Sequence, residues 1–454
     1  MAATGHVAVI DIGKTNAKVA LVDLAELREI DTRKRPNAVR AGPPYPHYDT
    51  DGLWAFILYA LAEMHRLHGI GAITVTTHGA SAALLDADGE LAAPVLDYEY
   101  QGPEALIQKY DALRPDFAET GSPPLPMGLN LGAQLFWQFE TFSEIRERTR
   151  TILTYPQYWA YRLTGKAVNE VTSLGCHTDL WRPRANGYSS LVERADWTAL
   201  MAPVAKAADR LGPILPQIAE AASLDPQTPV YCGIHDSNAS LYGHLVTREA
   251  PFAVVSTGTW VISMAIGGEV VELDPARDTL INVDARGKAV PSARFMGGRE
   301  MERMTGGVTP AFGDKEIAAV FEREAMLLPS VETRSGPFQG RVHRWTVDEA
   351  SLSDGARFVA VSFYLALMAA TGLEMTGARG PVLVEGPFAD NSAFLAMLAA
   401  VTGRPVTAVA GTGTSIGAAL LTTNGEVRRS SDEDVWTGKP GMEEYARRWR
   451  ELTG

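Results

Sequence analysis

The sequence predicts an α/β fold built of two similar lobes with a central cleft between them. The chain has 454 residues, too many for one ordinary hydrophobic core, so at least two domains are expected. An apolar, β-branched run at 7–10 leads through a turn of small and polar residues into a returning strand at 17–23. The same layout recurs at 252–264, about 250 residues later, so the lobes are expected to span 1–245 and 246–454.

The composition excludes several classes of protein. It is 46% hydrophobic and 21% charged, as in globular proteins, and the formal net charge of -13 with no local basic patch argues against nucleic acid or anionic membranes as partners. Cys176 and Cys232 form no C-x-x-C pair, so a reduced, cytoplasmic protein is the simplest interpretation. The N-terminus lacks a leader pattern, and no stretch is expected to reach the ~18 apolar residues that span a bilayer. A homodimer is compatible with the sequence, which does not define the oligomeric state.

Hydrophobic periodicity predicts the elements that follow each hairpin. Residues 50–67 carry apolar side chains at helical spacing, and Asp49 or Thr50 is the expected N-cap. Gly165 stands where a glycine commonly ends a helix. The other expected elements are strands at 72–77, 82–85, 229–232 and 381–385 and helices at 134–142, 155–163, 358–375, 391–402 and 416–421.

The turn Asp11–Asn16 is the first candidate site. Gly13 allows the backbone to approach a phosphate closely, and the N–H groups of such a turn can surround an anion. Thr15 and Asn16 carry side-chain donors, and Asp11 can hold Mg²⁺ through water. An ordinary β-hairpin turn is the alternative. Neither a Walker A loop nor a dinucleotide-binding fingerprint is present, because G-x-x-x-x-G-K-[ST] and G-x-G-x-x-G are both absent here.

The turn Ser256–Thr259 occupies the corresponding place in the second lobe. Two such turns would hold a polyphosphate from both sides. Each alone is a common small-residue turn, so the pair is more specific than either member.

Asp236 follows the strand at 229–232 and precedes a helix rich in small residues. A carboxylate at a strand end that faces a cleft is well placed as a general base, and His235 beside it could bind a substrate hydroxyl. The alternative is that Asp236 only caps the following helix. Both roles are compatible, since a helix N-terminus keeps a carboxylate ionised.

Three further glycine turns end predicted strands. His78–Gly79 ends the strand at 72–77, where glycine permits close approach of a ligand, and a strand-end turn with a hydrogen-bonded histidine is the alternative. Gly386–Asn391 and Gly411–Gly413 each lie between a strand and a helix. They either enclose an adenine ring, with Phe388 nearby, or are plain βα loops.

Taken in order, these segments resemble the FGGY family of carbohydrate kinases, which has the actin-like (ribonuclease H-like) two-lobed ATPase fold. The matching segments are IDIGKTNAKVALVD, TTHGASAALLD, YWAYRLTG, GIHDSNAS, STGTW, VEGPFADNSAFLAMLAAVTGRPV and GTGTSIGAALL. The ordered set covers nearly the whole chain and is far more specific than any single segment. An actin-like fold requires the strand-turn-strand setting of both turns.

The resemblance implies an ATP-dependent kinase that takes a small-molecule sugar as its partner and Mg²⁺ with its nucleotide. Asp236 matches the family's catalytic aspartate, which takes the proton of the attacking hydroxyl, and Asp11 and Asp236 are expected beside the metal. Such catalysis rests on positioning and charge neutralisation. The residues expected to bind the nucleotide are Asp11, Gly13, Lys14, Thr15, Asn16, Thr257, Gly258, Thr259, Gly386, Asn391 and Gly413.

The resemblance also bears on the sugar. The pair His235–Asp236 is similar to the form found in kinases of L-rhamnulose and L-fuculose, and Gly79, with its neighbour His78, matches a sugar-contacting glycine of the rhamnulose kinase branch. A ketose or deoxyketose is therefore the expected substrate. The alternatives are a xylulose or other pentulose kinase and a non-catalytic regulator that binds sugar or nucleotide.

The chain departs from the family pattern in three places. After Leu96, where many relatives have an arginine followed closely by an acidic residue, the residues at 97–100 include no arginine. Residues 127–131 and Trp260 also differ from the common pattern. These departures predict an atypical sugar pocket.

Overall fold

The computed structural model describes residues 5–409, 411, 413–423 and 434–454, which form two compact units. The first unit contains the chain up to Thr247, the segment Ile281–Ala289 and the described residues 413–423, and the second contains the other described residues. The change of unit after Thr247 lies close to the expected boundary. The return of the two later segments to the first unit was not expected from the sequence.

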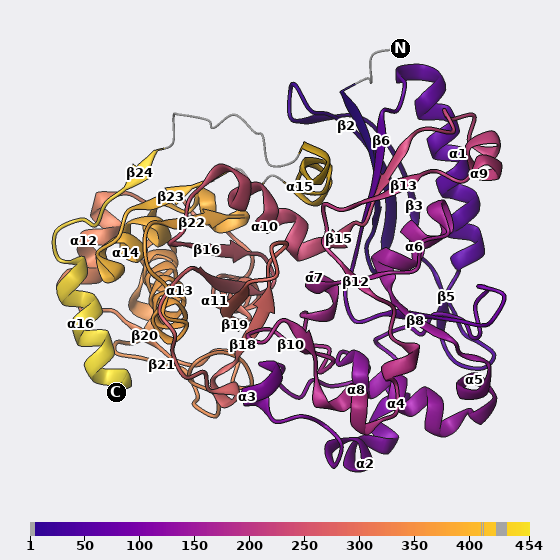
Figure 1. Cartoon of the computed structure of the whole chain (residues 1–454). Helices are drawn as coiled ribbons and strands as arrows, with labels where there is room; N and C mark the ends of the chain where they lie inside the picture. Colours follow the sequence, from indigo (N-terminus) through magenta and orange to yellow (C-terminus); the bar gives the residue numbers. More distant parts are fainter. Residues whose placement is uncertain (1–4, 410, 412, 424–433) are drawn as a thin grey trace. The chain divides into compact units, whose positions relative to one another are not determined.

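The first unit is organised around a seven-stranded mixed sheet (Figure 1). β1 pairs antiparallel with β2 and parallel with β6, which confirms the predicted hairpin around the first turn. β3 was not predicted, because its sequence REIDTRKRP lacks an apolar alternation. The sheet order is β13 (Arg210–Pro213), β14 (Pro229–Tyr231), β6 (Ala72–Thr77), β1 (His6–Ile12), β2 (Asn16–Asp23) and β3 (Arg28–Pro36), with β15 (Ile234–His235) paired to β6.

Helices and short strand pairs complete the first unit, and the predicted helices near 50, 134 and 155 are confirmed. The helices are α1 (Thr50–His68), α2 (Ile107–Asp111), α3 (Phe117–Thr120), α4 (Leu131–Thr141), α5 (Ser143–Arg148), α6 (Tyr155–Thr164), α7 (Val171–Leu174), α8 (Ser190–Arg194), α9 (Pro216–Ala221), α10 (Asp236–Thr247) and α15 (Gly413–Ala419). The strand pairs are β4 (Val39–Arg40) with β5 (His47–Tyr48), β7 (Ala82–Leu85) with β8 (Thr151–Thr154), β9 (Asn169–Glu170) with β12 (Val204–Ala205) and β10 (Trp181–Arg182) with β11 (Gly187–Tyr188).

The two faces of this sheet pack against different helices. Alternate side chains of β1, such as Ile10, join a buried cluster with the apolar stripe of α1 and with α6. α15 packs against β1 and β6 and also against α10. A Cβ atom on Gly417 would lie 1.8 Å from the carbonyl oxygen of Ala239, so a side chain there would force these two helices apart.

The second unit contains most of another seven-stranded sheet, in which β16 and β17 form the second predicted hairpin. Its order is β18 (Thr279–Val283), β19 (Ala289–Phe295), β17 (Val261–Ile266), β16 (Phe252–Thr257), β22 (Val382–Glu385), β23 (Val406–Ala408) and β24 (Val435–Trp436). The other elements are α11 (Gly297–Thr305), α12 (Asp314–Glu322), α13 (Asp354–Met375), α14 (Ser392–Thr402) and α16 (Met442–Thr453), with β20 (Leu327–Leu328) paired to β21 (Arg344–Trp345).

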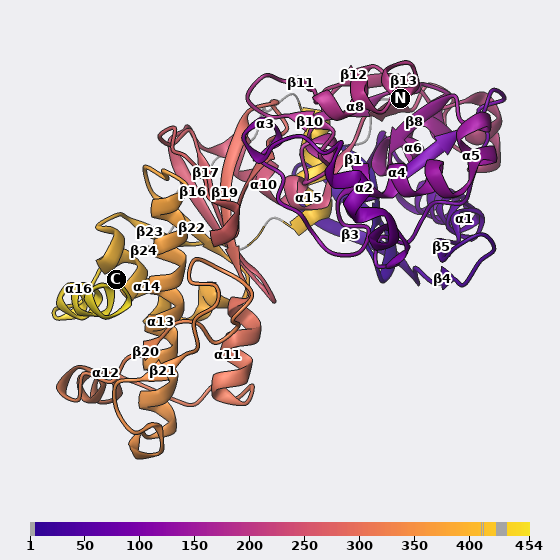
Figure 2. The ribbon, with the colours of Figure 1, turned by 90° about the horizontal axis from the view of Figure 1, so that it is seen from below.

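The helix α13 runs through the core of the second unit, where it packs beside α14 (Figure 2). By length and composition α13 could cross a membrane, so the expectation that no stretch reaches spanning length was wrong. Of its most apolar window, however, 83% is buried inside the protein. A helix that is covered on all sides by core residues is apolar all round, which accounts for its composition.

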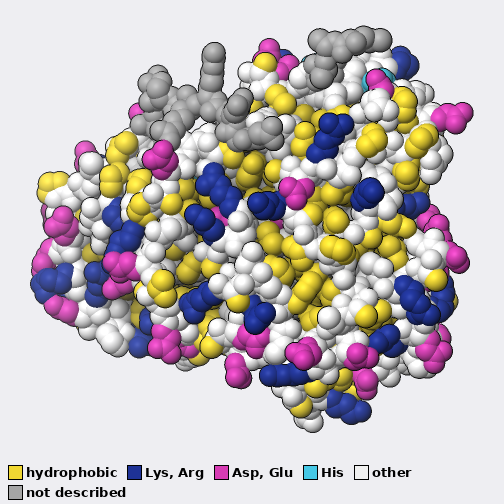
Figure 3. All heavy atoms as spheres, viewed as in Figure 1, with side chains coloured by type: hydrophobic (Ala, Val, Ile, Leu, Met, Phe, Trp, Pro, Cys, Tyr) yellow, Lys and Arg dark blue, Asp and Glu magenta, His cyan; other side chains and the backbone are white. Residues whose placement is uncertain are grey.

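On the face shown in Figure 3, basic and acidic side chains lie interspersed over the surface of the described residues.

Candidate active site

Three strands of the first sheet bring predicted site residues to one edge. β6 pairs in parallel with β1 on one side and with β15 on the other. Asp11 and Ile234 both face Thr76 of β6 across these pairings. Because parallel strands end at the same edge, the sheet places Asp11, His78 and Asp236 together, at the kind of edge where α/β proteins bind ligands.

Asp236 is the first residue of α10, and its side chain is 29% exposed. Its Oδ1 atom accepts a hydrogen bond from the N–H of Ser237 at 2.6 Å and lies 3.2 Å from Nε2 of His235. The buried ring of His235 has its Nδ1 atom 3.3 Å from the side-chain amide of Asn238. Nε2 of His235, which faces Asp236, donates to its carboxylate.

The buried sulfur of Cys176 lies near the same ring nitrogen of His235, with Sγ 3.6 Å from Nε2. Burial alone would lower the pKa of His235, but Cys176 and Asp236 raise it to about 9. Burial raises the pKa of the Cys176 thiol, and the neighbouring His177 and His235 outweigh burial and lower it to about 5. His235 therefore carries a positive charge beside Asp236 at neutral pH.

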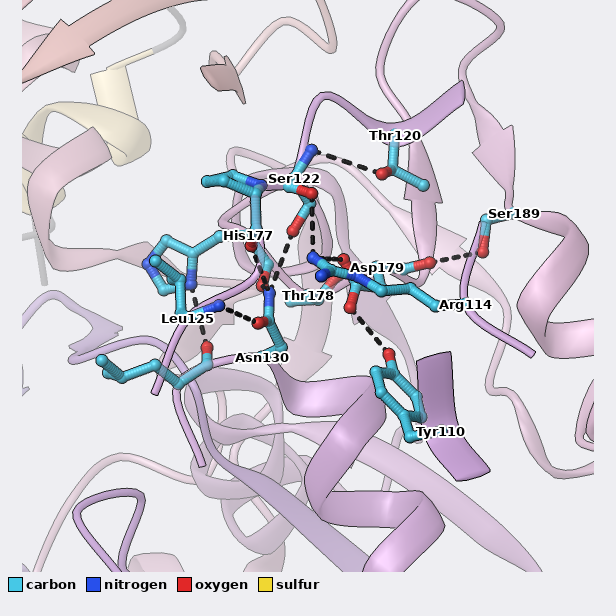
Figure 4. A network of polar contacts seen from close by, with 12 residues as sticks. Tyr110, Arg114, Thr120, Ser122, Leu125, Asn130, His177, Thr178, Asp179 and Ser189 are labelled. Atoms are coloured by element: carbon cyan, nitrogen blue, oxygen red, sulfur yellow. Dashed lines mark hydrogen bonds and ion pairs between the residues drawn. The ribbon is translucent and has the colours of Figure 1, made fainter. Parts of the chain in front are cut away.

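A buried polar network holds the turn that carries Cys176 (Figure 4). In this turn His177 and Asp179 have φ angles of 43° and 65°, in the left-handed region that non-glycine residues rarely adopt. The side chain of Asn130 donates to the carbonyl oxygen of His177 at 2.8 Å and accepts from the N–H of Leu125 at 2.8 Å. The atypical segment 127–131 thus supports the wall of the site.

The carboxylate of Asp179 anchors the end of the same turn (Figure 4). It accepts a hydrogen bond from the hydroxyl of Tyr110 at 2.7 Å and one from the guanidinium of Arg114 at 3.1 Å. Charge-assisted bonds of this kind are stronger than neutral ones. They compensate the strained backbone that brings Cys176 against His235.

A second buried chain of hydrogen bonds fixes the backbone of His235. The N–H of His235 donates to Oγ1 of Thr172 at 3.1 Å, and this hydroxyl donates to Oε2 of Glu170 at 2.5 Å. The carboxylate of Glu170 also caps α7 by accepting from two backbone N–H groups. Burial raises the pKa of Glu170 to about 7, against the lowering effect of these bonds.

The ring of His78 follows β6 and is enclosed by tyrosines, with its centroid 5.1 Å from Tyr48, 5.2 Å from Tyr98 and 5.1 Å from Tyr155. Burial lowers the pKa of His78 to about 4, so its imidazole is neutral at pH 7. Its Nδ1 atom lies 2.8 Å from the carbonyl oxygen of Gly79 and donates to it. Nε2 is therefore a buried acceptor, and it has no hydrogen-bond partner among the described residues.

Gly79 is required by packing. A Cβ atom there would lie 2.8 Å from Nε2 of His235. The absence of a side chain at Gly79 thus leaves room for the ring of His235.

The first turn presents residues of two kinds. Thr15 and Asn16 are exposed at its tip, and the N–H of Gly13 closes the turn by donating to the carbonyl oxygen of Asn16 at 2.9 Å. Lys14 points elsewhere: its Nζ atom contacts the carboxylate of Asp97 and lies 3.3 Å from that of Glu99. The predicted phosphate residues of this turn are thus divided between an exposed tip and a lysine engaged by carboxylates.

Asp11 lies beneath this turn in a polar setting. Oδ2 accepts from the hydroxyl of Thr414 at 2.6 Å and lies 3.6 Å from Nζ of Lys18. Burial raises the pKa of Asp11, the nearby charge of Asp236 adds to this effect, and Thr414 and Lys18 oppose it.

The donors around Asp11 bear on the expected Mg²⁺ site. No group of three or more His, Cys, Asp or Glu side chains within the described ranges could hold a metal by itself. Mg²⁺ typically takes one or two carboxylates and completes its coordination with water and substrate phosphates. Asp11 and Asp236, whose charges interact, fit this kind of ion.

In the second unit, the predicted nucleotide residues also hold together the ends of β16 and β22. Oγ1 of Thr257 donates to the carbonyl oxygen of Glu385 at 2.6 Å and accepts from the N–H of Phe388 at 3.0 Å. Gly386 has a φ angle of 81°, and a Cβ atom there would lie 2.0 Å from the carbonyl oxygen of Thr257. These two residues are therefore needed for the turn itself.

The other predicted residues of this unit are placed differently. Asn391 caps α14 by accepting from the N–H of Phe394 at 3.1 Å. Gly258 lies against the first turn of α11, where a Cβ atom on Gly298 would be 2.1 Å from its carbonyl oxygen, and Thr259 is exposed at the tip. The approach of α11 to this turn was not predicted.

Gly413 begins α15 in the first unit, whereas Gly386 and Asn391 lie in the second unit. The structure therefore does not place these three residues in one unit. Sequence reasoning also missed Thr414 and Thr172, whose roles depend on contacts across the fold. Glu170 carried a local signal, since it directly precedes a short V-T-S helix that it caps.

Comparisons with known proteins agree on one family. The FGGY family of carbohydrate kinases, N-terminal domain, matches residues 6–243, and the carbohydrate kinase FGGY, C-terminal domain, matches residues 249–430. L-fuculokinase of Salmonella typhi is 24% identical over 270 residues, which cover 58% of this chain and 57% of that protein. The match thus spans little more than half the length of this curated relative.

Solved structures extend the similarity over the whole chain. A carbohydrate kinase from Novosphingobium aromaticivorans is 37% identical, with a TM-score of 0.91 over 98% of this chain and 100% of that chain. Ligand-bound xylulose kinase from Lactobacillus acidophilus is 14% identical, with a TM-score of 0.78 over 99% and 96% of the two chains, which is a likeness of fold. The predicted actin-like α/β fold is confirmed, and the chain belongs to the FGGY family of carbohydrate kinases.

Proposed function

We propose that the protein transfers the γ-phosphoryl group of ATP to a hydroxyl group of a ketose, with L-fuculose and L-rhamnulose as the first candidates. The observation that carries this proposal is the position of Asp236, a partly exposed carboxylate beside the cation His235 where β6 and β15 end. The similarity to L-fuculokinase supports the choice of sugar.

In the proposed reaction, Asp236 accepts the proton of the attacking sugar hydroxyl. The hydroxyl oxygen then forms a bond to the γ-phosphorus, the bond from that phosphorus to the bridging oxygen breaks, and ADP leaves. His235 donates a hydrogen bond to Oδ1 of Asp236, which leaves Oδ2 to take the proton. The backbone N–H of His235 donates to Thr172 and its ring contacts the side-chain amide of Asn238, and these contacts hold His235 in place during this step.

The chain's own residues contribute mainly by positioning. The exposed tip of the first turn, Thr15 and Asn16, supplies donors for phosphate oxygens. Mg²⁺, when bound with ATP, would neutralise the charge that develops on the phosphates. In the second unit, Gly258 and Thr259 supply a turn of the same kind, and the segment at Gly386–Asn391 is the candidate for the adenosine.

Two other functions remain as alternatives. A xylulose or other pentulose kinase would use the same base, and the likeness of fold to xylulose kinase supports only the shared architecture. A non-catalytic regulator would bind sugar or nucleotide without transfer. A carboxylate placed as a general base beside His235, whose backbone is fixed by a buried hydrogen-bond chain, favours catalysis, because binding alone needs no base.

The test is a coupled assay of ADP release with L-fuculose, L-rhamnulose, L-ribulose and D-xylulose. Turnover that depends on one of these sugars supports the proposal, and the preferred sugar identifies the substrate. Measurable ATP binding without turnover on any of the four would refute the kinase proposal and favour a regulator.

A further inference from the structure

Lys14 lies in a cage of two carboxylates and two aromatic faces. Its Nζ atom contacts Asp97 and lies 3.3 Å from Glu99, 5.3 Å from the ring centre of Tyr48 and 4.9 Å from that of Tyr98. Oδ1 of Asp97 also accepts from the hydroxyl of Tyr48 at 3.3 Å and from the N–H of Glu99 at 3.1 Å, so the cage is cross-linked. The lysine is held by contacts on several sides.

The charge balance of this cage argues against a phosphate site at Lys14. One ammonium and two carboxylates sum to a formal charge of -1 (+1 from Lys14 and -1 each from Asp97 and Glu99). An anion that approached Lys14 would meet this excess of negative charge. The contribution of the first turn to phosphate binding must then come from its exposed tip and not from this side chain.

The cage adjoins the neutral acceptor of His78. The rings of Tyr48 and Tyr98 that face Lys14 are the same rings that contact His78. The charges of Lys14 and Asp236 both act on His78, so these three groups interact electrostatically. An ammonium donor, carboxylate acceptors and the unpartnered Nε2 of His78 thus lie around the same two tyrosine rings within the first unit.

Hydroxyl groups match this arrangement of donors and acceptors. Each hydroxyl both donates and accepts, so adjacent hydroxyls can accept from Lys14 while they donate to Asp97 and to Nε2 of His78. A carboxylate can only accept, and it would leave His78 unpaired and face two like charges.

We propose that Lys14, Asp97 and His78 bind the hydroxyls of the acceptor sugar away from the phosphorylated position, and that Asp97 and Glu99 select neutral sugars against sugar acids. This inference rests on the proposed kinase function for its kinetics, but it makes a claim about binding that needs no transfer. It assigns Lys14 to the sugar, where the family resemblance assigned it to the nucleotide.

The first experiment measures binding by calorimetry, with L-fuculose, L-rhamnulose and D-xylulose as neutral probes, D-gluconate as the acidic probe, and ATP titrated separately. In wild type, at least one neutral sugar should bind about tenfold or more tightly than D-gluconate. The proposal is overturned if D-gluconate binds more tightly than the neutral sugars, or if none of the neutral sugars binds. Sugar binding without turnover would refute the kinase function and leave this inference standing.

The second experiment uses Lys14→Met, which keeps the apolar stem, and Glu99→Gln, a change of similar size at a side chain that is 54% exposed. Lys14→Met should weaken binding of the neutral sugar by about 10- to 100-fold and change ATP binding by less than about twofold. Loss of ATP affinity with unchanged sugar affinity would assign Lys14 to phosphate and overturn the proposal.

Glu99→Gln removes one of the two negative charges and should narrow the preference for the neutral sugar over D-gluconate. An unchanged ratio contradicts the role of Glu99 in selection. Because this variant retains Lys14 and Asp97, it tests the proposal even where Lys14→Met fails to fold. The matched control is Lys34→Met, at an exposed lysine on β3. This variant should bind the sugars, D-gluconate and ATP with wild-type affinity.

Discussion

Nε2 of His235 lies 3.2 Å from Oδ1 of Asp236, so these adjacent residues face each other across the junction of β15 and α10. Where a strand is followed directly by a helix, the side chains of the two residues at the junction usually point in different directions. Here the backbone of His235 is fixed by Thr172 and its ring by Asn238, and the carboxylate begins the helix. The carboxylate of Asp236 is therefore held in place by the positively charged ring of His235.

Replacement of Asp236 by asparagine tests the base. Asp236→Asn keeps the size of the side chain but cannot accept a proton, so kcat should fall by about 10²- to 10⁴-fold while ATP affinity stays nearly unchanged. ADP release and calorimetric ATP binding measure the two quantities. Asp348→Asn, a change at an aspartate that only caps a short helix in the second unit, is the control. If Asp236→Asn keeps most of its kcat, Asp236 is not the base.

His235→Ala tests contact with the sugar. If His235 binds a sugar hydroxyl as expected, its loss should raise KM for the sugar by about tenfold or more and KM for ATP by less. His343→Ala in the second unit is expected to change neither value. Equal effects on the two KM values would refute a role for His235 in sugar binding.

Thr172 is expected to act through His235, as a positioning residue. Thr172→Val has the same shape but leaves the buried N–H of His235 unpaired, which costs about 1–3 kcal/mol. The reaction should show a kcat about tenfold lower with an unchanged KM for ATP, and Thr172→Ser should restore it. If valine and serine variants have equal kcat, the hydroxyl does not position His235.

The buried Glu300 of α11 should make stability depend on pH. Burial raises its pKa from 4.5 to about 7, although it accepts hydrogen bonds from the N–H of Glu332 and the hydroxyl of Tyr364. Between these two pKa values, Glu300 keeps its proton in the folded protein and releases it in the unfolded chain. The free energy of unfolding therefore decreases as pH rises through this range, by roughly 3 kcal/mol for this group once the pH is above about 7.

Glu300→Gln imitates the protonated form at every pH. The Tm of this variant should fall less than that of wild type between about pH 5 and pH 8, as measured by scanning calorimetry. Glu302→Gln, on an exposed position of the same helix, should follow the wild-type profile. Parallel profiles for Glu300→Gln and wild type would show that Glu300 keeps an ordinary pKa.

Local patterns predicted the frame of the fold well. Both hairpins, the helix α1 and its cap at Asp49 follow from apolar spacing and from a capping side chain that accepts from the N–H of Gly52. β3 was missed because it is the edge strand of its sheet, where charged residues are common and apolar alternation is weak.

The candidate site was predicted where residues lie at or just after the end of a strand. Asp11 lies near the end of β1, and His78 and Asp236 directly follow β6 and β15, so the parallel pairing of β6 gathers them. Cys176 and Asp97 carry no such signal, because their roles arise from contacts with residues more than fifty positions away. Such contacts depend on the tertiary fold and cannot be read from spacing.

The return of Ile281–Ala289 to the first unit limits how this protein can be divided genetically. The N–H of Ile281 donates to the carbonyl oxygen of Gly121 at 2.9 Å, and Val283 is fully buried in a cluster of first-unit residues. A gene fragment that stops at Thr247 would encode a first half with an uncovered apolar surface and an unpaired backbone carbonyl. Coexpression of a second fragment that supplies this loop is therefore a sounder way to obtain a folded first half than simple truncation.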